Sequence, residues 1–255
     1  MTARVISKAI AAAVALIWAA AAQAGETQVA VAANFTEPAT EIARLFTEKT
    51  GHVATLSFGA SGQFLTQISQ GAPFQVFLSA DAARPARAVA EGLAVEGSRF
   101  TYAVGTLVLW SREAGLVTGP ETLREMSFEK IAMADPDSAP YGAAAIETMR
   151  SLGLYDALSP RIVQGQSIAQ ALQFVDTGNA ALGFVALSQV AKRDGGSRWI
   201  VPADLHAPIL QDAVLLRTGA DNEAARAFLA FLKGPEAREV IRSFGYGIPA
   251  EALAG

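Results

Sequence analysis

The chain contains no cysteine and only two histidines among its 255 residues. The lack of cysteine excludes a disulfide framework, a thiolate metal site and a cysteine nucleophile. The two histidines, His52 and His206, lie too far apart in sequence to form a metal-binding motif. An excess of positive charge is also missing, because the formal net charge is −4. We therefore expect no metal centre, no cofactor and no nucleic-acid partner.

Long apolar runs are missing everywhere except at the N-terminus. Residues 1–24 begin with the basic side chains Arg4 and Lys8, continue as an apolar run, and end in Ala22-Gln23-Ala24. This pattern is typical of a secretory signal peptide and predicts cleavage after Ala24. No later stretch approaches the roughly 20 apolar residues of a transmembrane helix. We expect an exported, periplasmic protein of 231 residues with a formal net charge of −6.

The mature chain alternates strand-like and helix-like segments, which predicts an α/β fold with mostly parallel sheets flanked by helices. The expected strands are Val29–Ala32, Val53–Phe58, Gln75–Leu78, Arg99–Trp110, Ile131–Ala134, Arg161–Val163, Ala180–Val185, Trp199–Val201 and Ala213–Arg217. Residues 25–104 with 213–255 are predicted to form one lobe, and 105–212 the other. The chain would cross between lobes near Tyr102–Thr106 and Ala207–Leu215, which we expect to act as hinges.

Four predicted helices begin just after a short strand or loop, near Asn34, Ser61, Tyr141 and Ile168. The first backbone N–H groups of a helix have no partner inside it, so helix starts attract anions. In open α/β sheets such starts face a common crevice at the carboxyl ends of the strands. Because two starts come from each half of the chain, we expect a ligand cleft between two lobes.

The side chains at these helix starts are neutral hydrogen-bond donors, including Asn34, Ser61 and Tyr141. Asp81 is the only charged residue within 58–83. Sulfate, molybdate and tungstate are fully ionised oxyanions that accept hydrogen bonds and donate none. Phosphate near neutral pH keeps a proton and needs an acceptor as well. The pattern therefore favours a fully ionised oxyanion.

Short motifs follow one another in a recognisable order along the whole mature chain. They are Ala33-Asn34-Phe35-Thr36, Gly59-Ala60-Ser61-Gly62, Gln70-Gly71-Ala72-Pro73, Val76-Phe77-Leu78-Ser79-Ala80-Asp81, Asp135-Pro136, Pro140-Tyr141-Gly142, Leu182-Gly183-Phe184-Val185 and Phe231-Leu232-Lys233-Gly234-Pro235. This order resembles the periplasmic molybdate-binding proteins of ABC importers. The resemblance implies a two-lobed periplasmic-binding-protein fold of type II. It further implies a binding protein that closes on molybdate or tungstate and delivers it to a membrane permease. Such a protein would be a monomer and would not be an enzyme.

The resemblance also implies which residues hold the oxyanion by hydrogen bonds. Asn34 and Ser61 would each offer a side chain and a backbone N–H, Tyr141 its phenol, and Ile168 its backbone N–H at a helix start. Some family members place a binding tyrosine where this chain has Ala186. Others carry the phenolic donor at the position of Tyr141, so the predicted site is the first four residues without Ala186.

Two alternatives stay open at this stage. The first keeps the fold and replaces the ligand by sulfate, thiosulfate or another small anion. The second is an exported hydrolase with Ser61 or Ser167 as nucleophile, although the chain lacks a Gly-x-Ser-x-Gly elbow. Asn34 and Ser61 could also be simple helix caps. We expect Asp81 to cap the helix that follows it, and Asp135 to fix its loop by accepting a hydrogen bond.

Overall fold

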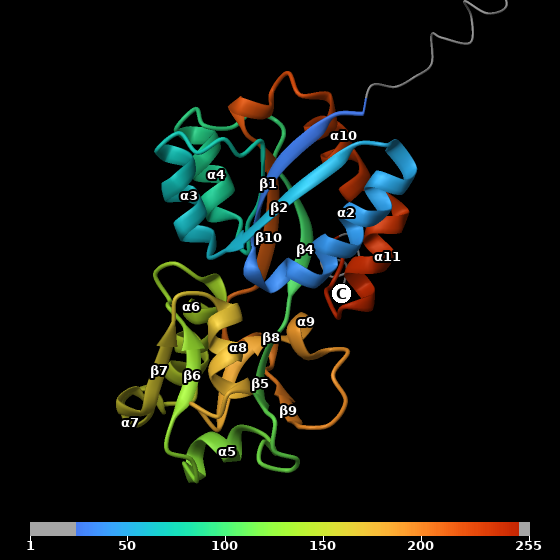
Figure 1. Cartoon of the computed structure of the whole chain (residues 1–255). Helices are drawn as coiled ribbons and strands as arrows, with labels where there is room; N and C mark the ends of the chain where they lie inside the picture. Colours follow the sequence, from blue (N-terminus) through green and yellow to red (C-terminus); the bar gives the residue numbers. More distant parts are fainter. Residues whose placement is uncertain (1–23, 250–255) are drawn as a thin grey trace, which may run out of the picture.

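The computed structural model describes residues 24–249, and Figure 1 shows them folded into two lobes, one above the other. The predicted signal peptide, residues 1–24, lies outside the described residues apart from Ala24. Within the described part, no helix combines the length and the apolar character needed to cross a membrane.

The first lobe contains a five-stranded sheet with the order β2-β1-β3-β10-β4. Its strands are β1 (Glu26–Ala32), β2 (Val53–Gly59), β3 (Val76–Leu78), β4 (Phe100–Gly105) and β10 (Ile209–Leu215). Strand β1 pairs in parallel with β2 and β3, whereas β10 runs antiparallel to β3 and β4. Four strands therefore share one direction, and only β10 opposes them.

The second lobe contains another five-stranded sheet, with the order β7-β6-β8-β5-β9. Its strands are β5 (Leu107–Ser111), β6 (Ile131–Ala134), β7 (Ile162–Gly165), β8 (Leu182–Ala186) and β9 (Ser197–Ile200). Strand β6 is parallel to β7 and β8, and β5 is antiparallel to β8 and β9. The prediction of a two-lobed α/β fold with mostly parallel sheets is confirmed.

Helices cover both faces of each sheet. In the first lobe they are η2 (Ala33–Phe35), α2 (Thr36–Thr50), α3 (Ser61–Ser69), α4 (Ala83–Ala90), η5 (Arg217–Gly219), α10 (Glu223–Leu232) and α11 (Pro235–Ser243). In the second they are α5 (Pro120–Glu125), α6 (Pro140–Ser151), α7 (Tyr155–Leu158), η3 (Ser159–Arg161), α8 (Ile168–Asp176), α9 (Leu187–Val190) and η4 (Ala203–Leu205).

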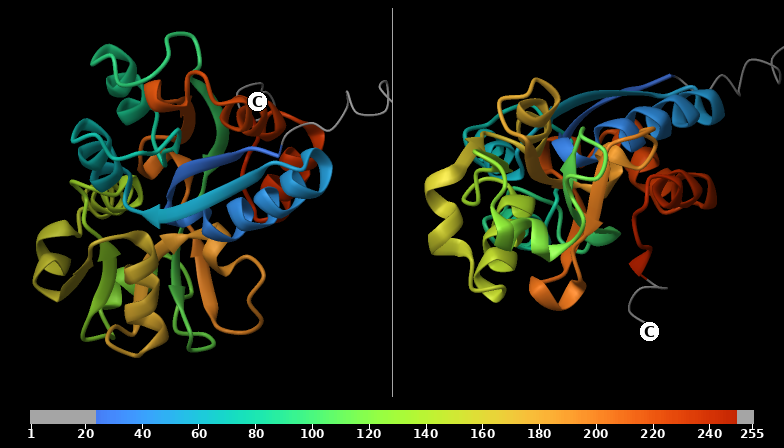
Figure 2. Two further views of the ribbon diagram at one scale, coloured as in Figure 1. Left: turned by 45° about the horizontal axis from the view of Figure 1, so that its top comes forward. Right: turned by 90° about the horizontal axis from the view of Figure 1, so that it is seen from below.

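The side chains of β1 show why helices pack on both faces of the first sheet. Val29 and Val31 pack into the core beneath α2, α10 and α11, whereas Ala30 packs into the core beneath α3 and α4. Successive side chains of a strand point to opposite faces, so a central strand with apolar residues throughout needs helices on both sides. Figures 1 and 2 show α2 beside α10 and α11 on one side of this sheet, with α3 and α4 on the other.

The chain crosses between the lobes at two described places. Thr106 alone separates β4 from β5, and residues 201–208 separate β9 from β10. The predicted lobe boundaries, after residue 104 and after residue 212, cut through these strands. Gly105 ends β4 and residues 209–212 begin β10, so both belong to the first sheet.

Strand β10 begins earlier than the sequence predicted. The sequence predicted a strand over Ala213–Arg217, but β10 starts at Ile209. The polar pair Gln211 and Asp212 hid its first half, because a polar pair inside an apolar run reads as a loop. Both side chains are buried, and Asp212 accepts hydrogen bonds from Arg99 (2.5 Å) and Thr101 (2.6 Å). A buried carboxylate is tolerated where it is paired in this way.

Candidate functional site

A small pocket lies between the two lobes, beside the carboxyl end of β1. Its volume is about 10 Å³, which is at the lower limit for holding a single water molecule. The lining residues are Ala32, Ala33, Asn34, Gly59, Ala60, Ser61, Ala80, Ala139, Pro140, Tyr141 and Ile168. The lining contains all four residues predicted for the site, and none of its residues is charged. The structure therefore brings together groups that lie up to 134 positions apart in the sequence.

Each predicted site residue lies at the start of a helix. Ser61 and Ile168 are the first residues of α3 and α8, Tyr141 is the second residue of α6, and Asn34 is the second residue of the 3-10 helix η2. Backbone N–H groups at these positions have no partner within their own helix. The positive ends of the α3, α6 and α8 dipoles, together with the start of η2, thus surround one uncharged cavity, and this arrangement favours an anion.

The Ser61 hydroxyl is set up to donate towards the cavity. Its Oγ accepts a hydrogen bond from the backbone N–H of Ala80 at 2.9 Å, and the residue is only 1% exposed. A hydroxyl has one hydrogen to donate. Because Ala80 already supplies a donor to this oxygen, the remaining hydrogen is available to a ligand oxygen.

The Asn34 side chain, predicted to bind the oxyanion, hydrogen-bonds to two other side chains of the protein. Its Nδ2 donates to Gln211 Oε1 at 2.9 Å and to Tyr246 Oη at 2.9 Å. Both N–H donors of the amide are therefore occupied by protein groups and do not face a ligand. The backbone N–H of Asn34 is left as its contribution to the cavity, while the side chain holds η2 against the rest of the first lobe.

Gln211 is the residue that sequence reasoning missed. It is fully buried, and its Oε1 accepts from Asn34 and from Tyr102 Oη (3.1 Å), while its Nε2 donates to Tyr141 Oη at 3.1 Å. One side chain thus ties together two predicted site residues from opposite lobes. The only signal in the sequence was a glutamine within an otherwise apolar stretch, and that signal does not reveal its partners.

Tyr141 is buried and keeps its proton. Burial raises the pKa of Tyr141 well above its usual value, and the neighbouring phenols of Tyr246 and Tyr102 raise it further. Burial likewise raises the pKa of Tyr102 well above its usual value and that of Tyr246 to about 12. These phenols therefore stay neutral across the physiological range. A neutral phenol is a hydrogen-bond donor, whereas a phenolate would repel an anion.

The raised pKa values predict a loss of stability at alkaline pH. Below about pH 10 the phenols are protonated in both the folded and the unfolded state, so they add no pH dependence. Above that pH the unfolded state releases protons that the folded state keeps, and the free energy of unfolding falls. For Tyr246, whose pKa is raised to about 12, the loss approaches about 3 kcal/mol above pH 12.

Urea unfolding between pH 8 and pH 11.5 measures this loss, and absorbance at 295 nm measures phenol ionisation directly. We expect most of the change at 295 nm in the native protein to occur well above pH 10. Completion of the ionisation near pH 10 without unfolding would contradict the buried arrangement. The variant Tyr246→Phe is the control, because its stability should fall less steeply with pH.

Ile168, the first residue of α8, lines the cavity. Its side chain is 4% exposed and packs in the second lobe's core. Ser167 caps α8 by accepting from Gln170 N at 3.3 Å, and the Ile168 carbonyl accepts from Gln189 Nε2 at 3.2 Å. Ala186, the position left out of the site, lies outside the cavity lining, and its backbone N–H donates to Gln189 Oε1 at 3.0 Å.

The two aspartates next to the site act structurally, as predicted. Asp81 accepts from Arg84 N at 2.9 Å and caps α4. Asp135 accepts from Asp137 N (3.2 Å), Ser138 Oγ (2.8 Å) and Gln164 Nε2 (3.2 Å). These three bonds fix the loop that leads from β6 into α6, and hence the position of Tyr141.

Comparison with known proteins agrees with this geometry. The family described as "Bacterial extracellular solute-binding protein" matches residues 27–247. The molybdate-binding protein ModA of Rhodobacter capsulatus is 61% identical over 88% of this chain and 89% of its own length. ModA of Azotobacter vinelandii is 54% identical over 90% of this chain and 93% of its own length. The solved periplasmic molybdate-binding protein of Azotobacter vinelandii superposes with a TM-score of 0.85 at 41% identity, covering 88% of this chain and 99% of that one.

The match extends over nearly all of the described residues, includes both lobes and covers every residue of the predicted site. Relatives of this kind are binding proteins and not enzymes, so the hydrolase alternative is set aside. The chain belongs to the family of bacterial extracellular solute-binding proteins.

Proposed function

We propose that this chain is an exported protein that captures molybdate, and also tungstate, between its lobes and delivers the oxyanion to the permease of an ABC importer. The observation that carries the proposal is the convergence of four helix starts, from Asn34, Ser61, Tyr141 and Ile168, on one small cavity without a charged side chain. The names of the two ModA relatives support the choice of molybdate.

The donors in the cavity match an ion that only accepts hydrogen bonds. Ser61 Oγ already accepts from Ala80 N, and Tyr141 Oη already accepts from Gln211 Nε2. The Ser61 hydrogen is therefore left for the cavity, and Tyr141, whose hydroxyl also bonds to Tyr246, lines the cavity as a neutral phenol. A ligand oxygen that carries a proton would find no carboxylate in the lining to accept it. Molybdate and tungstate meet this requirement, whereas hydrogen phosphate does not.

The affinity of such a site is the sum of several hydrogen bonds, each of modest free energy. A net hydrogen bond to a charged group contributes about 1.5–3 kcal/mol, and four backbone donors with two hydroxyls would together exceed about 8 kcal/mol before ordering costs. Micromolar or tighter binding is therefore reachable without an arginine or lysine at the ion. Sulfate is smaller than molybdate, and each donor that it fails to reach costs about 1–3 kcal/mol.

Titration calorimetry tests the proposal. The protein should release heat with molybdate and tungstate, bind sulfate at least about tenfold more weakly, since one donor left unmade is enough for that, and give no heat with phosphate. Sulfate or thiosulfate binding tighter than molybdate would favour the alternative ligand. No response to any of these anions would reject an oxyanion site in this cavity.

Export as a monomer belongs to the same proposal. The basic start and apolar run of residues 1–24 support a signal peptide cleaved after Ala24. N-terminal sequencing of the secreted protein tests the cleavage site, and light scattering of the purified protein tests the monomer.

The substitution Asn34→Ala should weaken molybdate binding about tenfold, because the network that fixes η2 would be lost. The change removes the amide nitrogen that donates to both Gln211 Oε1 and Tyr246 Oη. It should also lower the free energy of unfolding by about 1–3 kcal/mol. Calorimetry and urea unfolding of the same preparation measure both effects, and unchanged affinity would show that η2 does not contribute to the site.

A further inference from the structure

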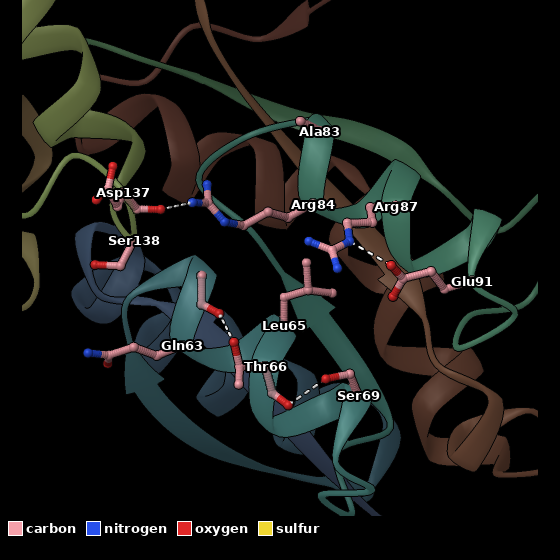
Figure 3. Close-up of a pocket in the computed structure, with 11 residues that line it drawn as sticks. Gln63, Leu65, Thr66, Ser69, Ala83, Arg84, Arg87, Glu91, Asp137 and Ser138 are labelled. Atoms are coloured by element: carbon pink, nitrogen blue, oxygen red, sulfur yellow. Dashed lines mark hydrogen bonds and ion pairs between the residues drawn. The ribbon is translucent and has the colours of Figure 1, made fainter.

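A second interlobe contact lies outside the cavity, along the edge of a groove of about 570 Å³. The groove runs beside α3 and α4 of the first lobe and the loop at Asp137 and Ser138 of the second. Figure 3 shows Arg84 reaching across from α4 towards Asp137, while Arg87 on the same helix turns to Glu91. The two arginines thus have different partners although they lie three residues apart.

Two hydrogen bonds join the lobes here. Arg84 Nη2 donates to the backbone carbonyl of Asp137 at 2.6 Å, and Gly62 N donates to the backbone carbonyl of Ser138 at 2.9 Å. The Arg84 guanidinium is also ion-paired with Asp81, which holds it in position, and its side chain is 19% exposed. A charged donor that is already oriented makes a strong bond to a carbonyl at little entropic cost.

Both sides of this contact are rigid. Gly62 lies in the first turn of α3, directly after Ser61. The loop that carries the two acceptor carbonyls is fixed by the three bonds to Asp135 and leads directly into α6 and Tyr141. A movement that brings α3 and α6 onto the ligand therefore brings these groups together as well.

The approach is so close that only glycine fits at position 62. A Cβ added there would lie 2.9 Å from Ser138 Cα, 3.2 Å from the Ser138 carbonyl oxygen and 3.2 Å from Arg84 Nη2. The first of these neighbours is backbone and cannot turn away. An alanine at position 62 would thus keep the lobes from meeting at this edge, although alanine suits a helix better than glycine does.

From these contacts we propose that Arg84 and Gly62, acting on the Asp137–Ser138 loop, form a clasp that holds the lobes closed and sets how long the oxyanion stays bound. The inference rests on the proposed function, since the ion is taken to be molybdate. Neither residue needs to touch the ion. The clasp stabilises the closed state, in which alone the donors from both lobes surround the ligand, so it raises the affinity by shifting that equilibrium. Arg84 is accordingly a positioning residue.

The experiment compares wild type with Arg84→Ala and Gly62→Ala, and uses Arg87→Ala as the matched control. Arg87 lies on the same helix and pairs only within the first lobe, with Glu91 at 2.6 Å. Release of ⁹⁹Mo-labelled molybdate into excess unlabelled molybdate gives the dissociation rate. We expect a rate about three- to tenfold faster for Arg84→Ala and Gly62→Ala, since one interlobe hydrogen bond is lost or strained, and no change for Arg87→Ala.

A second measurement follows closure without needing a ligand. Because the chain has no cysteine, the exposed residues Gln67 and Asp156 can be changed to cysteine in all four proteins and spin-labelled, one in each lobe. Distance distributions then give the closed fraction with and without molybdate. Arg84→Ala and Gly62→Ala should lower this fraction relative to Arg87→Ala. Gly62→Ala should do so with an unchanged or raised melting temperature, which separates closure from folding stability.

The outcomes are distinguishable. If wild type gives no heat with molybdate, the proposed function fails, and the closed fractions without ligand still decide the clasp. If wild type binds molybdate but both variants match Arg87→Ala in release rate and closed fraction, the clasp is wrong while the proposed function stands. A slower release in either variant would also overturn it.

Discussion

Ser61→Ala should weaken molybdate binding by about 10- to 100-fold, the cost of one lost hydrogen bond between a buried donor and a charged ligand, about 1.5–3 kcal/mol. The hydroxyl is 1% exposed and already accepts from Ala80 N. In the proposed site its hydrogen would be donated to the ion. The substitution removes this donor and also leaves Ala80 N without its acceptor, so a modest loss of stability should accompany the loss of affinity.

The control for this prediction is Ser69→Ala at the other end of α3. Ser69 Oγ donates to the Thr66 carbonyl at 2.8 Å, on the exposed surface and away from the cavity. Calorimetry with molybdate should give the wild-type affinity for Ser69→Ala and the reduced one for Ser61→Ala. Equal affinities for wild type and Ser61→Ala would place the ion elsewhere.

Gly105→Ala should have the second large effect, lowering affinity by about 30-fold or more and stability by about 1–3 kcal/mol, as overpacking a buried site does. Gly105 ends β4, next to the crossing at Thr106. A Cβ at this position would lie 2.2 Å from Tyr141 Oη and 2.7 Å from Gln211 Nε2. The buried ring of Tyr141 would have to move, and with it the phenol that lines the cavity.

A double-mutant cycle with Tyr141→Phe separates the steric effect from the lost donor. Removing the phenolic oxygen makes room for the new methyl group, so Gly105→Ala should cost less stability in the Tyr141→Phe background than in wild type. The affinity of the double variant should be close to that of Tyr141→Phe alone. Urea unfolding and calorimetry measure the two quantities. Wild-type affinity in Gly105→Ala would show that the phenol can shift without loss of binding.

The sequence predicted those parts of the site that depend on local signals. Apolar runs placed the strands, and the residues at the starts of α3, α6 and α8 identified Ser61, Tyr141 and Ile168 as lining groups. The role of Asp135 was also predictable, since an aspartate before a proline bonds to the next few residues of its own loop. In each case the determining interaction spans only a few positions along the chain.

Long-range partners could not be predicted in this way. The Asn34 side chain was expected to face the ligand, but it donates to Gln211 and Tyr246, which lie 177 and 212 positions away. Strand β10 was placed too late for the same reason, because nothing near Gln211 in the sequence shows that its amide is satisfied by groups from both lobes. The lack of room for a Cβ at Gly62 and Gly105 is likewise not visible in the sequence, because the atoms that occupy this room belong to distant segments of the chain.

The sequence by itself determined an α/β protein whose helices begin at uncharged donor residues, because strand burial and helix capping are decided over a few neighbouring residues. Only the tertiary structure decided which of those donors line the cavity and which are hydrogen-bonded to Gln211 and Tyr246. It also decided where the lobes touch. The physical reason is that a donor already satisfied within the protein is not available to a ligand, and its partner is fixed by how distant segments pack.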